Sequence, residues 1–319
     1  MQVTRRDFIR ASSAIAAALG LQSWGAVDAL GAEGGPSVVW LQASGCSGDS
    51  VSLLNSIEHG TIDKLLLETL DLNYHPTVMA AAGSAAVAAA REAYREKGYV
   101  LIVEGAIPTA NDGRYCTLWD GMTALTGVQG FARNAGFIIA AGTCACFGGV
   151  SAGKPNPTAA KGVRDVVRGK GVINIPGCPT HPDWLVGTVA YLLANGRVPP
   201  LDHLNRPTAY FGKTVHDECP YLDDYDDHCI RHRMAHADDI GGPKVLSDEG
   251  CLFAMGCKGR HAGGDCPTRG WNSGAVGAVG VNWCVTAGSP CIGCTEPGFP
   301  DRMSPFFTRL GTNAIDDND

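Results

Sequence analysis

The apolar positions between residues 36 and 200 come in short continuous runs, separated by longer segments that favour helices. Short continuous runs are typical of strands that are buried on both faces of a sheet. Their alternation with helical segments predicts an α/β fold with a parallel sheet covered by helices. The predicted strands are 38–42, 99–103, 137–141 and 172–175, and the predicted helices are about 49–58, 84–97, 121–134 and 182–195.

Each predicted strand is followed by a residue whose side chain can bind metal or take part in a reaction. Cys46 follows the first strand, Glu104 the second, Cys144 and Cys146 the third, and Cys178 the fourth. In an open α/β sheet, ligands bind beyond the carboxyl ends of the strands. Because four separate loops agree, we expect the three cysteine loops and Glu104 to converge on one site.

The sequence changes character near Pro199-Pro200. Residues 201–319 carry 8 of the 13 cysteines, many Gly and Asp residues, and little periodicity. Such a segment buries too little apolar surface to fold alone, so we expect it to fold around metal. The predicted domains are therefore 33–200 and 201–319.

Residues 1–32 have the features of a twin-arginine signal peptide. Arg5-Arg6 precede an Ala-rich apolar segment, and small residues that suit a cleavage site follow it. The alternative is a chance arginine pair before a short buried helix. The apolar part is too short for a membrane span, and no later segment reaches about 18 uninterrupted apolar residues. We therefore expect an exported chain with no membrane span of its own.

Composition and charge narrow the class of protein. The chain is 45% apolar and 18% charged, which suits a globular protein with a sizeable core. Its formal net charge of −7 argues against nucleic acid as a partner. Thirteen cysteines in an exported chain would suit a disulfide framework. Disulfide scaffolds are usually small, however, and an odd number of cysteines cannot pair fully, so metal binding is favoured.

The C-terminal region contains two sets of potential metal ligands. The first is His216, Cys219, Cys251 and Cys257, and the second is Cys266, Cys284, Cys291 and Cys294. Sets of four that are rich in thiolates suit either zinc or iron–sulfur clusters. Spacing alone does not exclude zinc. Together with the cysteines at the strand ends, these two sets would make three metal sites in one chain. Three sites are more than structural stability alone would need, but they suit a path for electrons.

Six segments resemble the small, electron-transferring subunit of nickel–iron hydrogenases. They are VEGAIPT (103–109), GTCACFGG (142–149), IPGCPTHPDW (175–184), HDECP (216–220), GCKG (256–259) and PCIGCTEPGFPD (290–301). The resemblance runs from about residue 38 to 307. It implies a flavodoxin-like N-terminal domain and a mostly irregular C-terminal iron–sulfur domain. It also implies a periplasmic hydrogenase, in which this chain forms an obligate complex with a large subunit that holds the nickel–iron centre.

The resemblance also implies three iron–sulfur clusters. The proximal ligands would be Cys46, Asp49, Cys144 and Cys178, the distal ligands His216, Cys219, Cys251 and Cys257, and the medial ligands Cys266, Cys284, Cys291 and Cys294. Many family members have Pro where Cys284 stands, and their medial cluster is 3Fe–4S. A thiolate at Cys284 predicts a 4Fe–4S medial cluster, as in the nickel–iron–selenium branch; the alternative is a buried free thiol. Glu104 would lie near the proximal cluster, for proton transfer or only for a hydrogen bond.

Asp49 departs from the family pattern, which has Cys at this position. Three interpretations compete. Asp49 is the fourth ligand of a 4Fe–4S cluster, or Cys146 swings in to replace it, or the site holds three irons and Asp49 caps the helix that begins there. The distal 4Fe–4S cluster would have one imidazole ligand, His216. Cys116 and Cys229 have no role in the pattern and are expected to be structural thiols.

The segment 216–229 (HDECPYLDDYDDHC) contains six acidic residues and no Lys or Arg. It is either a solvated charge run or a surface that steers a basic c-type cytochrome toward the distal cluster. Two other classes of protein remain as alternatives. One is a single-cluster subunit of a quinone-reducing respiratory complex, and the other is a zinc-stapled secreted binding protein.

Overall fold

The computed structural model describes residues 37–56, 62, 70–225, 245–246, 250–271, 283–308 and 310. The predicted signal peptide 1–32, Cys229 and the end of the acidic segment lie outside the described residues. The chain divides into two compact units, Met1–Ala209 and Tyr210–Asp319.

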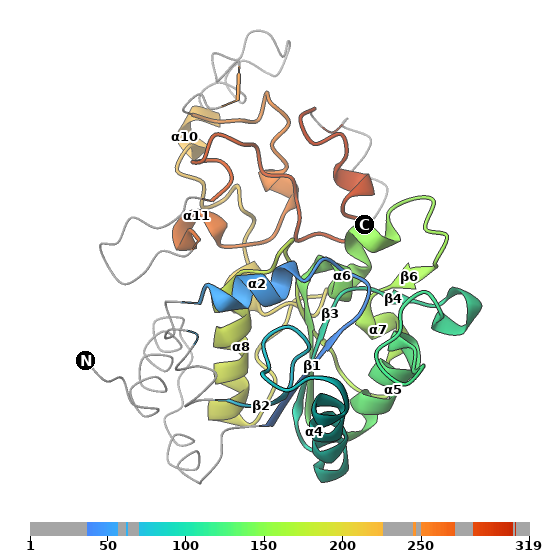
Figure 1. Cartoon of the computed structure of the whole chain (residues 1–319). Coiled ribbons are helices and arrows are strands. Elements are labelled where there is room, and N and C mark those ends of the chain that lie inside the picture. The colour runs from blue at the N-terminus through green and yellow to red at the C-terminus, as the bar shows by residue number, and fades with distance from the viewer. Residues whose placement is uncertain are drawn as a thin grey trace. The chain divides into compact units, whose positions relative to one another are not determined.

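Five parallel strands form the sheet of the first unit (Figure 1). They are β1 (Ser37–Gln42), β2 (Asp71–Tyr74), β3 (Val100–Glu104), β5 (Phe137–Ala141) and β7 (Ile173–Ile175). Their order is β2-β1-β3-β5-β7, which is the flavodoxin-like order. The predicted α/β class with a parallel sheet is confirmed. The sequence missed β2 because this edge strand, DLNY, is partly exposed and lacks an apolar run.

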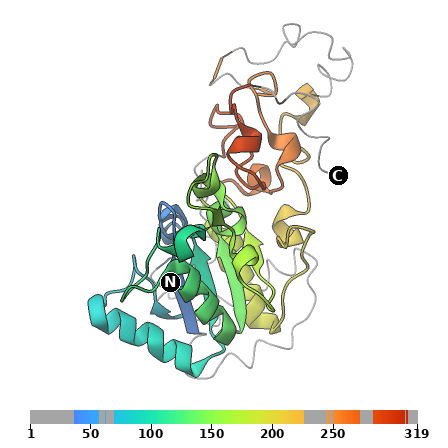
Figure 2. The ribbon, with the colours of Figure 1, turned by 90° about the vertical axis from the view of Figure 1, so that its right-hand side faces the viewer.

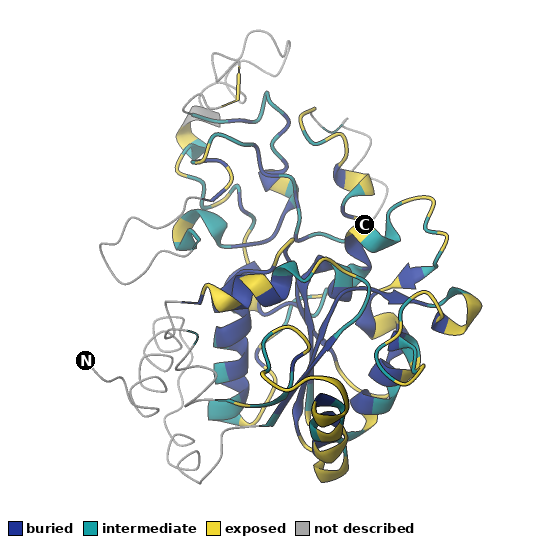
Figure 3. Ribbon diagram, viewed as in Figure 1, coloured by how far each residue is buried: buried dark blue, intermediate teal, exposed yellow. Residues whose placement is uncertain are grey.

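Helices cover both faces of this sheet. They are α2 (Gly48–Leu54), α4 (Gly83–Glu96), α5 (Ala124–Asn134), α6 (Gly142–Phe147), α7 (Val163–Val166) and α8 (Pro182–Asn195). Helices α2 and α8 pack together at one face, and α4 and α5 lie side by side at the other (Figures 1 and 2). All five residues of β3 are buried, as a strand between two helical layers requires (Figure 3).

Shorter elements complete the first unit. The strands β4 (Ile107–Pro108) and β6 (Ala160–Lys161) form an antiparallel pair, and η3 (Ala110–Gly113) and η4 (Gly149–Ala152) are 3-10 turns. The main core lies between the sheet and helices α4 and α5. It includes alternate residues of the central strands, such as Val39 and Leu41 of β1.

The second unit has little regular structure in its described part. Its short helical elements are α9 (Thr208–Phe211), which begins just before the unit, α10 (Leu222–Tyr225), η7 (Gly259–His261), α11 (Cys266–Arg269) and η8 (Asp301–Met303). A small apolar core includes Val215, Leu252, Trp283 and Val285, with several cysteines packed against it. The predicted irregular C-terminal region is confirmed. None of the described helices, in either unit, is long and apolar enough to cross a membrane.

Candidate functional site

The loops after β1, β3, β5 and β7 meet at the carboxyl edge of the sheet. Ala43 donates its backbone N–H to the carbonyl of Glu104 at 2.7 Å, which joins the first two loops. Thr143 donates its N–H to the carbonyl of Gly177 at 2.8 Å, which joins the last two. The junction of β1 and β3 is also where the strand order reverses, the place at which α/β folds bind ligands.

Two glycines make room for side-chain donors at this edge. A Cβ at Gly142 would stand 2.0 Å from Oδ2 of Asp49, and a Cβ at Gly149 would stand 2.8 Å from Sγ of Cys144. Both glycines also have positive φ values, +80° and +50°, which an L residue adopts only with strain. The carboxylate of Asp49 therefore packs directly against the turn that carries Cys144, and the expected convergence of the loops is confirmed.

The donors at this edge also affect one another electrostatically. Burial raises the pKa of the Cys178 thiol to about 11, and the negative charges of Cys144, Asp49 and Cys46 add to this effect. Burial likewise raises the pKa of Cys144, and Asp49 and Cys46 add to this effect. Groups that disfavour one another's ionisation must be close together. Four such donors can all ionise when a cationic metal centre lies among them.

Asp49 is buried, and its Oδ1 accepts a hydrogen bond from the backbone N–H of Thr180 at 2.7 Å. Burial raises the pKa of Asp49 to about 7; the Thr180 hydrogen bond lowers it and the charge of Glu104 raises it. The Asp49 carboxylate thus faces the loop of Cys178 and does not cap α2. The hydroxyl of Thr180 is itself buried without a hydrogen-bond partner in the described part of the chain, which suits a site that a further group completes.

Glu104 performs the capping that one interpretation gave to Asp49. Its Oε1 accepts the backbone N–H groups of Asp49 and Ser50, both at 3.0 Å. Its Oε2 accepts from Trp40 Nε1 and Gln42 Nε2, both at 2.9 Å, and from the Ser50 hydroxyl. The carboxylate is 2% exposed and satisfies the first N–H groups of α2. The sequence placed Glu104 at this edge but carried no signal of these partners.

The other two cysteines of the first unit make contacts of their own. Cys146 belongs to the main core, and its thiol donates to the carbonyl of Ala140 at 3.3 Å. Cys116 is half-buried, and its carbonyl accepts the N–H of Ala124 at the start of α5. Burial raises the pKa of both thiols, and the charges of Asp49 and Cys144 add to this effect on Cys146. Inert, protonated thiols are typical of structural cysteines.

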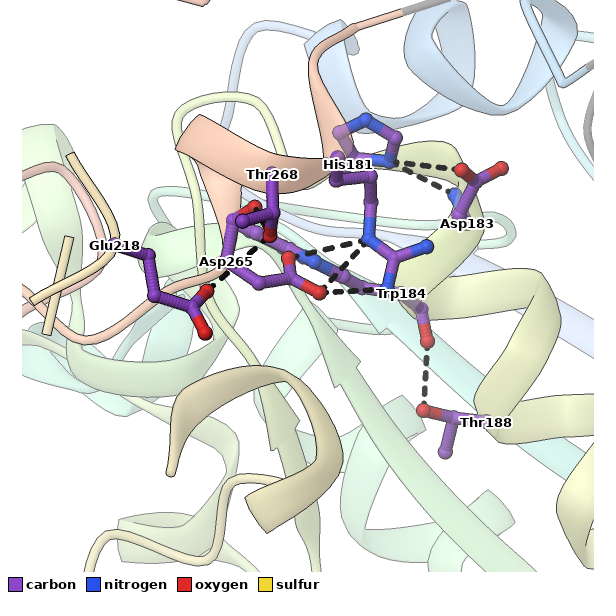
Figure 4. Close-up of polar contacts among 8 residues, drawn as sticks. His181, Asp183, Trp184, Thr188, Glu218, Asp265 and Thr268 are labelled. Carbon is purple, nitrogen blue, oxygen red and sulfur yellow. Dashed lines mark hydrogen bonds and ion pairs between the residues drawn. The ribbon is translucent and has the colours of Figure 1, made fainter. Parts of the chain in front are cut away.

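The loop of Cys178 leads directly into α8. His181 caps this helix, because its Nδ1 accepts the N–H of Asp183 at 3.1 Å (Figure 4). The imidazole ring of His181 lies 5.5 Å from the ring of Trp184, and both side chains are buried. Thr188 donates its hydroxyl to the carbonyl of Trp184 at 2.6 Å within the same helix (Figure 4). The cap fixes the residue at which the chain turns from the cysteine loop into the helix.

The second unit gathers the cysteines of the predicted medial set. Burial raises the pKa of Cys266 well above its usual value, and Cys294 and Cys284 add to this effect. Burial has the same effect on the pKa of Cys291, to which Cys257, Cys294 and Cys266 contribute. These four cysteines therefore lie near one another, with Cys257 beside them.

Polar contacts fix the helix that Cys266 begins. Asp265 forms an ion pair with Arg269 at 2.6 Å, one turn further along α11 (Figure 4). Thr268 donates its hydroxyl to Oε2 of Glu218 at 3.2 Å, which connects α11 with the segment after His216 (Figure 4).

The predicted distal set comes from two adjacent segments. His216 donates its backbone N–H to the carbonyl of Gly259 at 3.0 Å, two residues after Cys257. Cys219 donates its N–H to the carbonyl of His216 at 3.1 Å. The backbone thus brings the segment of His216 and Cys219 beside Cys257, while Cys251 precedes the turn that leads to Cys257.

The described donors do not converge on a single-ion site. No three His, Cys, Asp or Glu side chains among the described residues are placed to hold one metal ion together.

Comparisons with known proteins cover both units. Residues 46–192 match the family described as NADH ubiquinone oxidoreductase, 20 Kd subunit, and residues 211–307 match the family described as NiFe/NiFeSe hydrogenase small subunit, C-terminal. The chain is 42% identical over 315 residues to the periplasmic [NiFe] hydrogenase small subunit 1 of Nitratidesulfovibrio vulgaris, across 96% of this chain and 93% of the relative. It is 39% identical over 333 residues to the periplasmic [NiFeSe] hydrogenase small subunit of Desulfomicrobium baculatum, across 96% and 99%.

Solved structures agree with these relatives. A chain of the H2-activated [NiFeSe] hydrogenase of Desulfomicrobium baculatum aligns with a TM-score of 0.76 and 38% identity. The alignment covers 88% of this chain and all of that chain. The similarity therefore includes both compact units.

Proposed function

The chain belongs to the small-subunit family of the nickel–iron and nickel–iron–selenium hydrogenases, and from this premise we propose that it relays electrons through three iron–sulfur clusters. The relay would connect the nickel–iron centre of a large subunit, where hydrogen is split or formed, with an external carrier. The observation that carries the proposal is the gathering of Cys46, Asp49, Cys144 and Cys178 at the carboxyl edge of the sheet.

Each proposed cluster takes four side chains of this chain. The proximal ligands are Cys46, Asp49, Cys144 and Cys178; the medial ligands are Cys266, Cys284, Cys291 and Cys294; the distal ligands are His216, Cys219, Cys251 and Cys257. When bound, iron–sulfur clusters accept and release single electrons. The protein contributes fixed loops, burial and hydrogen bonds, which hold the ligands and set the potentials.

We propose Asp49 as the fourth proximal ligand. Its carboxylate lies against Gly142, two residues before Cys144, and its own contacts orient it toward the Cys178 loop. The competing interpretation, in which Cys146 takes its place, would require that thiol to leave the core and its contact with Ala140. The interpretation as a helix cap loses its basis, because Glu104 accepts the first N–H groups of α2.

Two other functions are less well supported. The match of residues 46–192 to a subunit of NADH ubiquinone oxidoreductase fits a single-cluster respiratory subunit, but it leaves the cysteines of residues 211–307 without a role. A zinc-stapled secreted protein would not explain the identity of 39% to 42% with hydrogenase small subunits, which extends over 96% of this chain. Either alternative predicts a metal content different from three iron–sulfur clusters.

The proposed complex is periplasmic. Several relatives are named periplasmic hydrogenase subunits, and residues 1–32 have the order of a twin-arginine signal. We propose that the large subunit is exported across the membrane together with this chain. The proposed functional domains are 33–200 for the proximal cluster and 201–319 for the other two.

The proposed electron carrier is a basic c-type cytochrome that approaches the acidic segment 216–229. Part of the charge in the described portion is already engaged, since Glu218 pairs with exposed Lys213 at 2.8 Å. The remaining carboxylates would steer the carrier by long-range attraction. The rate of cytochrome reduction should therefore fall as ionic strength rises, whereas an acidic cytochrome should react slowly at every salt concentration.

Iron analysis with low-temperature EPR of the purified complex of small and large subunits tests the proposal. Three four-iron clusters predict about twelve irons per small subunit beyond the active site, and no 3Fe–4S signal in the oxidised sample. About four irons would favour the single-cluster respiratory subunit. Zinc without iron would identify the stapled binding protein, and a strong 3Fe–4S signal would overturn one of the four-iron assignments.

A further inference from the structure

Lys258 is a fully buried lysine in the second unit. Its side chain is 1% exposed, and its Nζ lies within hydrogen-bond distance of four backbone carbonyl oxygens. The oxygens belong to Gly256 at 2.8 Å, Pro305 at 3.1 Å, Phe306 at 3.5 Å and Thr308. This contact ties the chain near residue 256 to the segment 305–308.

The carbonyl cradle favours a charged ammonium group. An ammonium has three N–H donors and no acceptor, whereas a neutral amine would turn its lone pair toward a carbonyl oxygen. Burial lowers the pKa of Lys258, and Cys257 and Cys291 raise it. No carboxylate of the described residues pairs with Lys258. The negative groups beside this buried cation are therefore cysteines.

These cysteines belong to two different proposed clusters. Lys258 directly follows Cys257, a proposed distal ligand, and donates its backbone N–H to the carbonyl of Cys291, a proposed medial ligand, at 2.7 Å. A Cβ at Gly293, between Cys291 and Cys294, would stand 3.4 Å from Cβ of Lys258. Lys258 thus connects the ligand loops of the second and third clusters.

We propose that Lys258 is a positioning residue whose fixed positive charge raises the reduction potentials of the medial and distal clusters. The inference rests on the proposed function, because it concerns the clusters proposed there. Each cluster gains one electron on reduction, and no bond forms or breaks. The added negative charge is stabilised by a nearby cation, and most strongly where water does not screen the interaction. The carbonyl cradle keeps the ammonium in place.

Redox titration of the purified complex of both subunits, followed by EPR, tests this inference. Lys258→Gln removes the charge but keeps N–H donors for the carbonyls, and Lys258→Arg keeps the charge. We expect Lys258→Gln to lower the midpoint potentials of the medial and distal signals and Lys258→Arg to leave them near the wild-type values. The proximal signal, whose proposed ligands come from residues 46–178, serves as the internal reference. Lys213→Gln removes an exposed lysine of the same unit and should cause a much smaller shift.

The other outcomes distinguish failure of the proposed function from failure of the role of Lys258. A wild-type complex without iron–sulfur signals would refute the proposed function itself. Intact signals with unchanged medial and distal potentials in Lys258→Gln would overturn the role of Lys258, as would equal shifts in Lys258→Gln and Lys258→Arg. Loss of iron from Lys258→Gln would also overturn it, because the lysine would then serve assembly and not potential.

Discussion

The backbone N–H of Asp49 donates to Oε1 of Glu104 at 3.0 Å, between residues 55 positions apart in the chain. Ser50 donates to the same oxygen at the same distance. A residue at the end of β3 therefore caps a helix that follows β1. Because a helix N-terminus favours a negative partner, this contact fixes α2 and with it the loop of Cys46.

Replacement of Glu104 by Gln should weaken this junction. The amide oxygen can still accept from Asp49 and Ser50, but the amide nitrogen would face the donors of Trp40 and Gln42. Each buried donor left without an acceptor costs about 1–3 kcal/mol, so we expect Glu104→Gln to lower stability by about 3 kcal/mol. Thermal unfolding of the complex with the large subunit, together with EPR of the proximal cluster, measures the effect.

A matched control for this prediction is Glu92→Gln on the exposed face of α4. A surface change of this kind should alter stability by less than about 0.5 kcal/mol. If Glu104→Gln unfolds at the wild-type temperature with an unchanged proximal signal, the charge of Glu104 has no part in holding α2.

Asp49→Ala and Cys146→Ala together test the fourth proximal ligand. If Asp49 binds iron, Asp49→Ala should lose about one iron per complex and show a 3Fe–4S signal after oxidation. Cys146→Ala should keep the iron, because this thiol contacts Ala140 in the core. The reverse pattern, with iron lost only from Cys146→Ala, would assign the ligand to Cys146.

Much of the fold followed from local sequence pattern. The apolar runs that became β1, β3 and β5 were predicted to within one residue, because a strand covered on both faces must be apolar throughout. Helix α8 was predicted at its observed bounds, Pro182–Asn195. The edge strand β2 was missed because its half-exposed residues lack this signal. The sequence predicts a cysteine loop where helix α6 forms, because these six residues carry no helical period.

The sequence predicts less of the site than of the fold. Strand ends predicted that the loops of Cys46, Cys144 and Cys178 meet, because parallel topology alone demands it. The capping of α2 by Glu104 and the carbonyl cradle of Lys258 were not predicted. Both join residues more than 40 positions apart, and no local pattern encodes such a pair.

Gly142→Ala should disturb the proposed proximal site through Asp49. The new Cβ would lie 2.0 Å from Oδ2 of Asp49, so the carboxylate must move. We expect a 3Fe–4S signal like that of Asp49→Ala, in addition to the strain of a φ of +80°, about 1–2 kcal/mol. Gly121→Ala provides the same strain at φ +75° with nothing within 4 Å of the new Cβ. Equal iron content in the two variants would show that the Asp49 carboxylate does not hold iron.

His75 should make the stability of the complex sensitive to acid. It is fully buried, its ring lies 4.7 Å from that of Trp40, and its Nδ1 accepts the N–H of Thr77 at 3.2 Å. Burial lowers the pKa of His75 to about 4, although the charge of Glu104 raises it. Between pH 6.5 and about 4, the unfolded chain therefore binds a proton that the folded chain does not. The contribution of neutral, buried His75 to the free energy of unfolding is therefore fully present above pH 6.5. As pH falls toward 4, up to about 3 kcal/mol of stability is lost.

Comparison of the wild type with His75→Phe isolates this contribution from all other acid-sensitive groups. The variant keeps an aromatic ring beside Trp40 but cannot titrate. We expect it to unfold at a lower temperature than the wild type at pH 7, and this difference should shrink steadily toward pH 4.5. His203→Phe, at an exposed position, should follow the wild-type profile over the same range. A constant difference between His75→Phe and the wild type at every pH would mean that His75 binds its proton equally in both states. In that case its buried position would contribute packing alone.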